Sequence, residues 1–126
     1  MCYREQLPEG CPPPTATRIE ATQEFYRLIR ADPPTDEDFA SWRALHPDRP
    51  LPEGQTECGV RGLSLFGRRT DVERRRGLAS LRNHQVVCTV TLELGAGRVQ
   101  RTRGGSHHTW WPLADFDILA RCRVGG

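Results

Sequence analysis

The chain has 126 residues, which is enough for one hydrophobic core, because folded domains cluster at roughly 100 to 150 residues. No stretch approaches the ~20 consecutive apolar residues of a membrane-spanning helix, so we expect no membrane association. All 18 basic side chains are arginine: residues 1–60 hold 6 of them against 11 acidic residues, and residues 61–126 hold 12 against 5. The basic half could attract phosphates or an acidic protein partner, although solvated arginine side chains explain it as well.

The five cysteines are widely spaced and odd in number, and no pair has the C-x-x-C spacing. They are Cys2, Cys11, Cys58, Cys88 and Cys122. This arrangement predicts neither a disulfide framework nor a zinc finger, and it favours a reducing, cytoplasmic location. The N-terminus carries charges and lacks the apolar run of a signal peptide, which agrees with that location.

Residues 1–22 are rich in proline and poor in large apolar side chains, with Pro8 followed by the run Pro12–Pro14. Such a composition does not offset the conformational entropy that is lost on ordering. We therefore expect residues 1–22 to form a disordered N-terminal arm and residues 23–126 to form a single α+β domain.

The first half of this domain shows two strands and two helix starts. Residues 24–31 are rich in aromatic and branched side chains, which favours a strand, and residues 62–66 form a second, shorter apolar run between glycines. Thr35 precedes three acidic residues and predicts a helix N-terminus, after which several prolines enforce a loop. The T-x-x-E pattern that begins at Thr70 predicts a capping box and a helix to about Arg82.

The second half is dominated by residues 85–94, in which apolar and polar side chains alternate at the period of a β-strand. Residues 98–103 are expected to pair back as an edge strand, and residues 104–111 to form a loop rich in histidine and tryptophan. Residues 118–124 are expected to form the last strand. The predicted fold class is α+β, with one or more small mixed or antiparallel sheets and two short helices.

The expected loop concentrates side chains that bind ligands: His107, His108, Thr109 and Trp110 stand together. They either line a binding site or cover the open end of the sheet. A zinc site would need four ligands, and these histidines with the scattered cysteines show no metal-ligand spacing, so we expect no metal. Ser64 as a nucleophile with a histidine base is disfavoured too, because its surroundings lack the G-x-S-x-G elbow.

Nucleic acid is a further candidate partner. The arginines between residues 68 and 103 could contact phosphates if they share a surface, and a tryptophan could stack on a base. The isoelectric point of about 8.4 and the lack of a recognised nucleic-acid-binding motif weigh against this interpretation.

The order of these patterns resembles a group of small, functionally uncharacterised bacterial proteins. The shared features are the strand FYRLIR, the following PPT and Phe39, the G-x-S turn that ends at Ser64, and the segment HHTWW before the last strand. The resemblance covers residues 25–124. More remotely, the layout is similar to the ADP-ribosyltransferase and RES-toxin type of fold, in which NAD lies in a cleft between two small sheets.

That resemblance implies roles for three residues. Arg27 on the first strand would hold the dinucleotide, Ser64 would be the small hydroxyl residue of a middle strand, and Asp117 would be the acid that engages the nicotinamide ribose. The usual terminal Glu is replaced by the shorter Asp117. Each residue also has a structural explanation, because an arginine can pair across the sheet, a serine can satisfy a turn and an aspartate can cap a loop.

The leading hypothesis is therefore a nucleotide- or dinucleotide-binding domain related to ADP-ribosyl transfer or NAD cleavage, with NAD as the candidate substrate. Its cleft would be lined by Arg27, Ser64, His107, His108, Trp110 and Asp117. The alternative is a non-catalytic binding module of the immunity or antitoxin kind, whose basic half meets an acidic protein or a nucleic acid.

Overall fold

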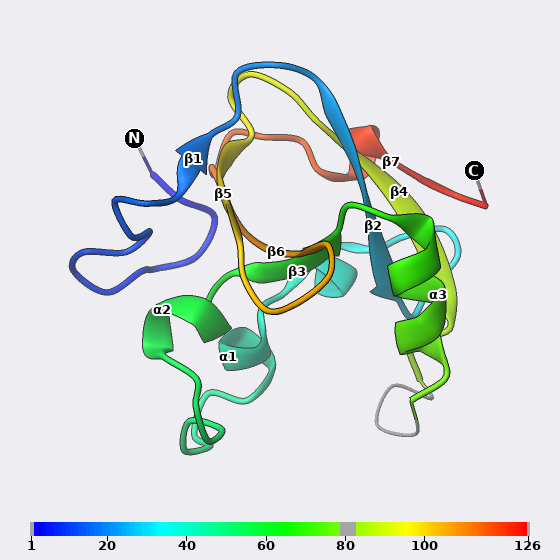
Figure 1. Cartoon of the computed structure of the whole chain (residues 1–126). Coiled ribbons are helices and arrows are strands. Elements are labelled where there is room, and N and C mark those ends of the chain that lie inside the picture. The colour runs from blue at the N-terminus through cyan, green and yellow to red at the C-terminus, as the bar shows by residue number, and fades with distance from the viewer. Residues whose placement is uncertain (1, 79–82, 126) are drawn as a thin grey trace.

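The structure is a computed structural model that describes residues 2–78 and 83–125. Its strands form one antiparallel sheet in the order β1-β5-β6-β3-β2-β4-β7 (Figure 1). The strands are β1 (Thr17–Arg18), β2 (Gln23–Ile29), β3 (Leu63–Phe66), β4 (Val86–Leu92), β5 (Gly97–Arg101), β6 (His107–Pro112) and β7 (Cys122–Val124). The helices are the 3-10 turns η1 (Asp36–Phe39) and η3 (Leu119–Arg121) and the α-helices α1 (Trp42–Leu45), α2 (Glu57–Val60) and α3 (Arg69–Arg76). The predicted α+β class is confirmed, with an antiparallel sheet.

The strand predicted from residues 85–94 is confirmed and organises one half of the sheet. β4 pairs with every residue of β2 on one side and with β7 on the other. Its side chains Cys88, Val90 and Leu92 are fully buried. The period of two in the sequence follows from this, because alternate side chains of a strand point to the same face.

Two apolar clusters lie on opposite faces of the sheet. The larger contains Trp110 and Leu65 together with other inward side chains of the strands. The smaller lies under α3, where Val72 clusters with Phe66 and Val87. The neighbours Leu65 and Phe66 belong to different clusters because successive side chains of β3 point to opposite faces. Val72 is the one buried residue of α3, so this helix is attached through a small apolar contact.

The sheet is nearly divided between β2 and β3. These two strands share a single pair of residues, Tyr26 opposite Phe66, whereas β3 pairs with β6 along its whole length. Beyond that pair β2 and β3 separate. One half of the sheet is therefore β1, β5, β6 and β3, and the other half is β2, β4 and β7 (Figure 1).

The prediction of a disordered arm over residues 1–22 is wrong for residues 2–22. β1 pairs with β5, so β5 is an interior strand and not the predicted edge strand. Glu5 accepts hydrogen bonds from the backbone N–H and the hydroxyl of Ser41 (2.8 and 2.5 Å). The arm is ordered because it covers a sheet edge and buries Ile19, which is 1% exposed.

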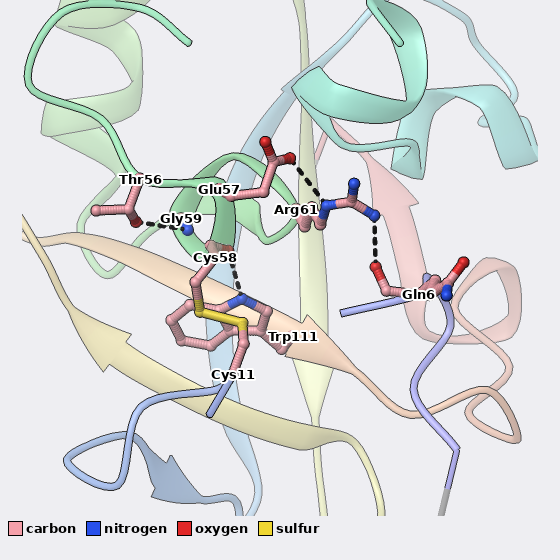
Figure 2. The surroundings of a disulfide bond; sticks show 8 residues. All are labelled: Gln6, Cys11, Thr56, Glu57, Cys58, Gly59, Arg61 and Trp111. Atoms are coloured by element: carbon pink, nitrogen blue, oxygen red, sulfur yellow. Dashed lines mark hydrogen bonds and ion pairs between the residues drawn. A yellow bond between two sulfur atoms is a disulfide. The ribbon is translucent and has the colours of Figure 1, made fainter. Parts of the chain in front are cut away.

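A disulfide links Cys11 of the arm to Cys58 of α2, which corrects the prediction that the cysteines form no disulfide framework. Figure 2 shows this bond against the indole of Trp111, whose Nε1 donates to the carbonyl of Cys58 (3.0 Å). Arg61 also binds the arm, at the carbonyl of Gln6 (2.7 Å). The pairing joins residues 47 apart in sequence, a contact that local spacing rules do not detect.

The helix predicted from Thr35 is broken in two. η1 follows Thr35 and ends at Ala40, whose backbone is extended (φ −87°, ψ 143°). The hydroxyl of Ser41 then caps α1 by accepting a hydrogen bond from the N–H of Ala44 (3.1 Å). The chain bends here because Ser41 is fixed from the other side by Glu5 of the arm.

The prediction for the helix near Thr70 needs correction at both ends. α3 begins one residue before Thr70, so the predicted capping box does not form there, and its N-cap residue is Arg68. α3 ends at Arg76, with Gly77 as its C-cap, and is shorter than the predicted helix to about Arg82. Residues 79–82 themselves lie outside the described part of the chain. α2 was not predicted, because its four residues are too few for a helical pattern in the sequence.

Residues 107–112 form a strand and not the predicted loop. β6 pairs with β3 on one side and with β5 on the other. Its side chains are buried on both faces of the sheet, so the sequence shows no alternation of apolar and polar residues. The last predicted strand, residues 118–124, is shortened to β7 because residues 119–121 form η3.

We expect the double variant Cys11→Ser, Cys58→Ser to unfold more readily than the wild-type protein. A cross-link between residues 47 apart removes loop-closure entropy from the unfolded chain, which corresponds to about 4 kcal/mol. Urea titration followed by tryptophan fluorescence measures the loss. Cys2→Ser, which removes an exposed free thiol, is the control and should leave the midpoint unchanged. Equal midpoints for the double variant and the wild type would contradict a stabilising role of the bond.

Candidate ligand-binding cleft

A cleft of about 580 Å³ opens where β2 and β3 separate, and we call it the β2–β3 cleft. β2 and β3 contribute to its wall together with α1, the segment after α1, and α3. Its described lining residues are Arg27, Leu28, Ala40, Trp42, Leu45, His46, Arg49, Ser64, Phe66, Arg75 and His84. Three of these residues are arginines and none is acidic, so the lining is positively charged.

Arg27 joins the two sides of the β2–β3 cleft. Its guanidinium donates to the main-chain carbonyl of Ser64 through Nη1 (2.8 Å) and to that of Asp38 through Nε and Nη2 (3.1 and 3.0 Å). The guanidinium also lies 5.6 Å from the centroid of the Phe39 ring. Burial lowers the pKa of Arg27, although an arginine stays charged at neutral pH. Two of its five N–H groups remain for a ligand.

Asp38 holds η1 in the position that Arg27 requires. Its carboxylate accepts hydrogen bonds from the backbone N–H groups of Arg30 and Thr35 (both 2.9 Å) and from the hydroxyl of Thr35 (3.2 Å). Burial on its own would raise the pKa of this carboxyl, but the hydrogen bonds from Arg30 and Thr35 outweigh burial and lower it. The ionised side chain thus fixes the carbonyl of the same residue beside Arg27.

The guanidinium groups of two other arginines in the cleft make no described hydrogen bond or ion pair. Among the described residues, neither Arg49 nor Arg75 has a hydrogen-bond or ion-pair partner for its guanidinium. Arg43, by contrast, donates two hydrogen bonds to the carboxylate of Glu57 (2.8 and 2.9 Å). Guanidinium groups that line a concave surface without a partner are suited to bind a phosphate or a carboxylate.

Aromatic rings lie beside these arginines. Trp42 packs against His46, with 5.1 Å between the ring centroids, and against the guanidinium of Arg43. Phe66 contacts the ring of His107 edge-on at 5.2 Å. Trp42 and Phe66 both line the cleft, so it combines flat apolar surface with positive charge.

A chain of hydroxyl and imidazole groups ends at Ser64 in the β2–β3 cleft. Nε2 of His107 lies 3.2 Å from Oγ of Ser64, and Nδ1 lies 2.8 Å from Oγ1 of Thr102. Oγ1 of Thr102 is in turn 2.9 Å from Oγ1 of Thr109. His107 reaches Ser64 because it stands opposite Phe66 in the β3–β6 register and is therefore a diagonal neighbour of Ser64.

The imidazole of His107 is neutral at pH 7. Burial lowers its pKa to about 4, and the nearby cations Arg103 and Arg75 act in the same direction. A neutral imidazole has one N–H donor and one nitrogen lone pair. Because its conjugate acid is so strong, His107 is a poor general base for Ser64 and serves instead as a hydrogen-bonding group.

Of the residues that the sequence assigned to a site, the structure brings three together. Arg27 and Ser64 line the cleft, and His107 of β6 contacts Ser64 without itself belonging to the described lining. Thr109 contributes only indirectly, through its hydroxyl contact with Thr102.

The structure places the other three predicted site residues outside the lining of this cleft. Trp110 is fully buried in the larger core, and His108 packs against Phe25 with 5.1 Å between the ring centroids. Asp117 is exposed, and its carboxylate accepts a hydrogen bond from the N–H of Ala120 at the start of η3 (3.3 Å). The acid and the arginine that the family resemblance paired therefore lie in different places.

Four residues of the site were not singled out in the sequence: Trp42, Arg49, Phe66 and Thr102. Arg75 was considered only as one of the arginines between residues 68 and 103 that could contact phosphates. Arg49 stands in a proline-rich loop and Arg75 in a run of three arginines, and both patterns are typical of solvated surfaces. No local charge pattern distinguishes these two arginines, because Asp48 directly precedes Arg49 and Glu73 stands two residues before Arg75.

Within residues 2–78 and 83–125, no group of three or more His, Cys, Asp or Glu is placed to hold a metal ion. No helix in the same ranges is long and apolar enough to cross a membrane. Burial raises the pKa of the Cys88 thiol to about 12, so this cysteine is not a nucleophile at neutral pH.

The fold and the cleft together define a small antiparallel α+β domain with a cationic, partly aromatic cleft. Comparison of the chain with models of protein families, with curated proteins and with solved structures found no match. The function is therefore inferred from the geometry of the β2–β3 cleft.

We expect the stability of the protein to fall as the pH is lowered from about 6.5 to about 4. Unfolded His107 takes up a proton near pH 6.5, whereas the folded residue resists protonation down to about pH 4. The unfolded state binds more protons in this window, so folding loses up to about 3 kcal/mol across it. Urea titrations at several pH values measure the loss.

The variant His107→Phe should show a flatter dependence on pH over the same window. His84, whose pKa is also lowered by burial, supplies a smaller dependence that remains in this variant. Parallel profiles for the wild type and His107→Phe would show that His107 does not titrate as its burial implies.

Proposed function

We propose that the β2–β3 cleft binds a nucleotide or dinucleotide through its phosphates and one planar ring. The observation that carries this proposal is the lining itself, in which three arginines stand beside Trp42 and Phe66 with no acid among the described residues. Arg49 and Arg75 offer guanidinium groups to phosphate oxygens. The two aromatic rings offer a surface to a base or a nicotinamide ring.

The position of the cleft supports the same proposal. It lies between the two halves of the sheet, with Arg27 on the first long strand and Ser64 on a middle strand. These strand positions are the ones that the resemblance to ADP-ribosyltransferase and RES-toxin folds implies for the two residues, but the cleft here lies within one sheet and not between two. A volume of about 580 Å³ is within the range of small-molecule sites, and it suits a ligand larger than a free phosphate.

We propose binding as the function, and not cleavage of NAD. Cleavage of the nicotinamide bond develops positive charge on the ribose, which a nearby carboxylate would stabilise. Asp117, the acid implied by the resemblance, caps η3 and does not line the cleft. NAD and ADP-ribose therefore enter the proposal as ligands.

The test is isothermal titration of the purified protein with ADP-ribose, NAD and AMP, alongside thermal unfolding with each compound in excess. A ligand of the folded state stabilises it by about 2.7 kcal/mol at a hundredfold excess over its dissociation constant. Arg49→Gln and Arg75→Gln should each weaken binding roughly tenfold to a hundredfold, because each removes a charge-assisted hydrogen bond of about 1.5–3 kcal/mol.

Arg18→Gln is the matched control, because it removes one arginine from a surface hollow formed with Tyr3 and Leu113. This variant should bind like the wild type. Equal affinity of all three variants, or no binding of any of the three compounds, would overturn the proposal. A short RNA is titrated in parallel. Binding of RNA alone would favour the alternative of a non-catalytic module that uses its basic half.

The cytoplasmic location expected from the sequence stays a prediction, and the disulfide weighs against it, because disulfides are rare in reducing compartments. Alkylation of the denatured protein, recovered from cells under acid quench, distinguishes the two cases. A reduced chain carries five reactive thiols. A chain that retains the Cys11–Cys58 bond leaves Cys2, Cys88 and Cys122 as the free thiols.

A further inference from the structure

We propose that His107 is a positioning residue that makes the Ser64 hydroxyl a hydrogen-bond donor to an anionic oxygen of the ligand, and that Thr102 stabilises the required imidazole tautomer by donating to Nδ1. The proposal rests on the proposed binding function of the β2–β3 cleft. It goes further by assigning two residues that contribute to ligand recognition without lining the cleft.

The chain of contacts from Thr109 to Ser64 has two consistent directions. In the first, Thr109 donates to Thr102, Thr102 donates to Nδ1 of His107, and Nε2–H of His107 donates to Oγ of Ser64. The hydroxyl hydrogen of Ser64 is then free to point into the cleft. In the second direction every hydrogen bond is reversed, and Ser64 donates to Nε2 and presents only lone pairs to the cleft.

An anionic ligand selects the first direction. A phosphate oxygen repels the lone pairs of Ser64 and accepts its hydroxyl hydrogen, so binding favours the state in which His107 donates through Nε2. The second direction would place two acceptors against each other at the ligand. The carbonyl of Ser64 is held by Arg27, which restrains the main chain that carries the hydroxyl.

The surroundings of His107 keep it available for this role. The charged groups near it are Arg75 and Arg103, with His108 adjacent in the chain, and they disfavour the doubly protonated ring, which could not accept from Thr102. The backbone N–H of Thr102 also donates to the carbonyl of His107 (3.0 Å), which holds the two side chains at this spacing.

A double-mutant cycle on ADP-ribose affinity tests the proposal, using Ser64→Ala, His107→Phe and the combination of both. Phenylalanine preserves the ring beside Phe66 and removes both nitrogens. If His107 acts through Ser64, each single variant binds about tenfold more weakly, and the double variant is no weaker than Ser64→Ala. Additive losses in the double variant would overturn the proposal.

Conservative variants separate positioning from a loss of fold. His107→Gln retains an amide N–H that can replace Nε2–H and should restore most of the affinity. Thr102→Val removes the hydroxyl and should weaken binding by severalfold, whereas Thr102→Ser keeps the hydroxyl and should bind like the wild type. Thermal unfolding without ligand confirms that each variant is folded. Equal affinity of Thr102→Val and Thr102→Ser would exclude a role for Thr102.

Nitrogen-15 NMR of the His107 ring gives a direct readout, because protonated and unprotonated ring nitrogens have distinct shifts. With ADP-ribose bound we expect the hydrogen on Nε2 in the wild type. A hydrogen on Nδ1 in the complex would overturn the inference while leaving the proposed function intact. If Arg49→Gln and Arg75→Gln bind ADP-ribose as well as the wild type does, the proposed function is overturned, whatever the tautomer of His107.

Discussion

The β2–β3 cleft depends on the hydrogen bonds that the guanidinium of Arg27 donates. β2 and β3 separate after one shared pair of residues, and a continuing sheet would satisfy the carbonyl of Ser64 from the neighbouring strand. Arg27 takes over that hydrogen bond and at the same time binds the carbonyl of Asp38. One half-buried cation therefore bridges the gap in the sheet and fixes η1 beside it. Removing a charge from water, even in part, is tolerated only when such partners compensate for its lost hydration.

The arginines in and near the cleft differ in whether their guanidinium groups have partners within the protein. Arg27 donates to carbonyls of the cleft wall, whereas Arg43 lies outside the described lining and joins α1 to α2 through Glu57. Arg49 and Arg75 lie in the same cleft without a described partner. The four residues are chemically identical, and only their surroundings distinguish a structural arginine from one available to a ligand.

The features that could be predicted from the sequence were those with a local cause. β4 was predicted because its apolar side chains recur at every second residue, whereas Arg27 and Ser64 were assigned from the family resemblance. The arm and the Cys11–Cys58 bond could not be predicted, because both depend on contacts with distant segments. Asp117 was assigned from the family pattern, and no local signal distinguishes a site acid from one that caps η3.

The histidine segment was expected to form a loop, but the structure places it in a strand. His107 lies in β6, buried on both sides by neighbouring strands. Burial there removes its value as a base, since its pKa falls to about 4, and leaves Thr102 in the position that an acid occupies in a serine hydrolase. A hydroxyl cannot stabilise an imidazolium as a carboxylate does. The contact between Ser64 and His107 therefore resembles a catalytic pair in distance but is suited, by its electrostatics, to holding a neutral hydrogen-bond chain against a bound anion.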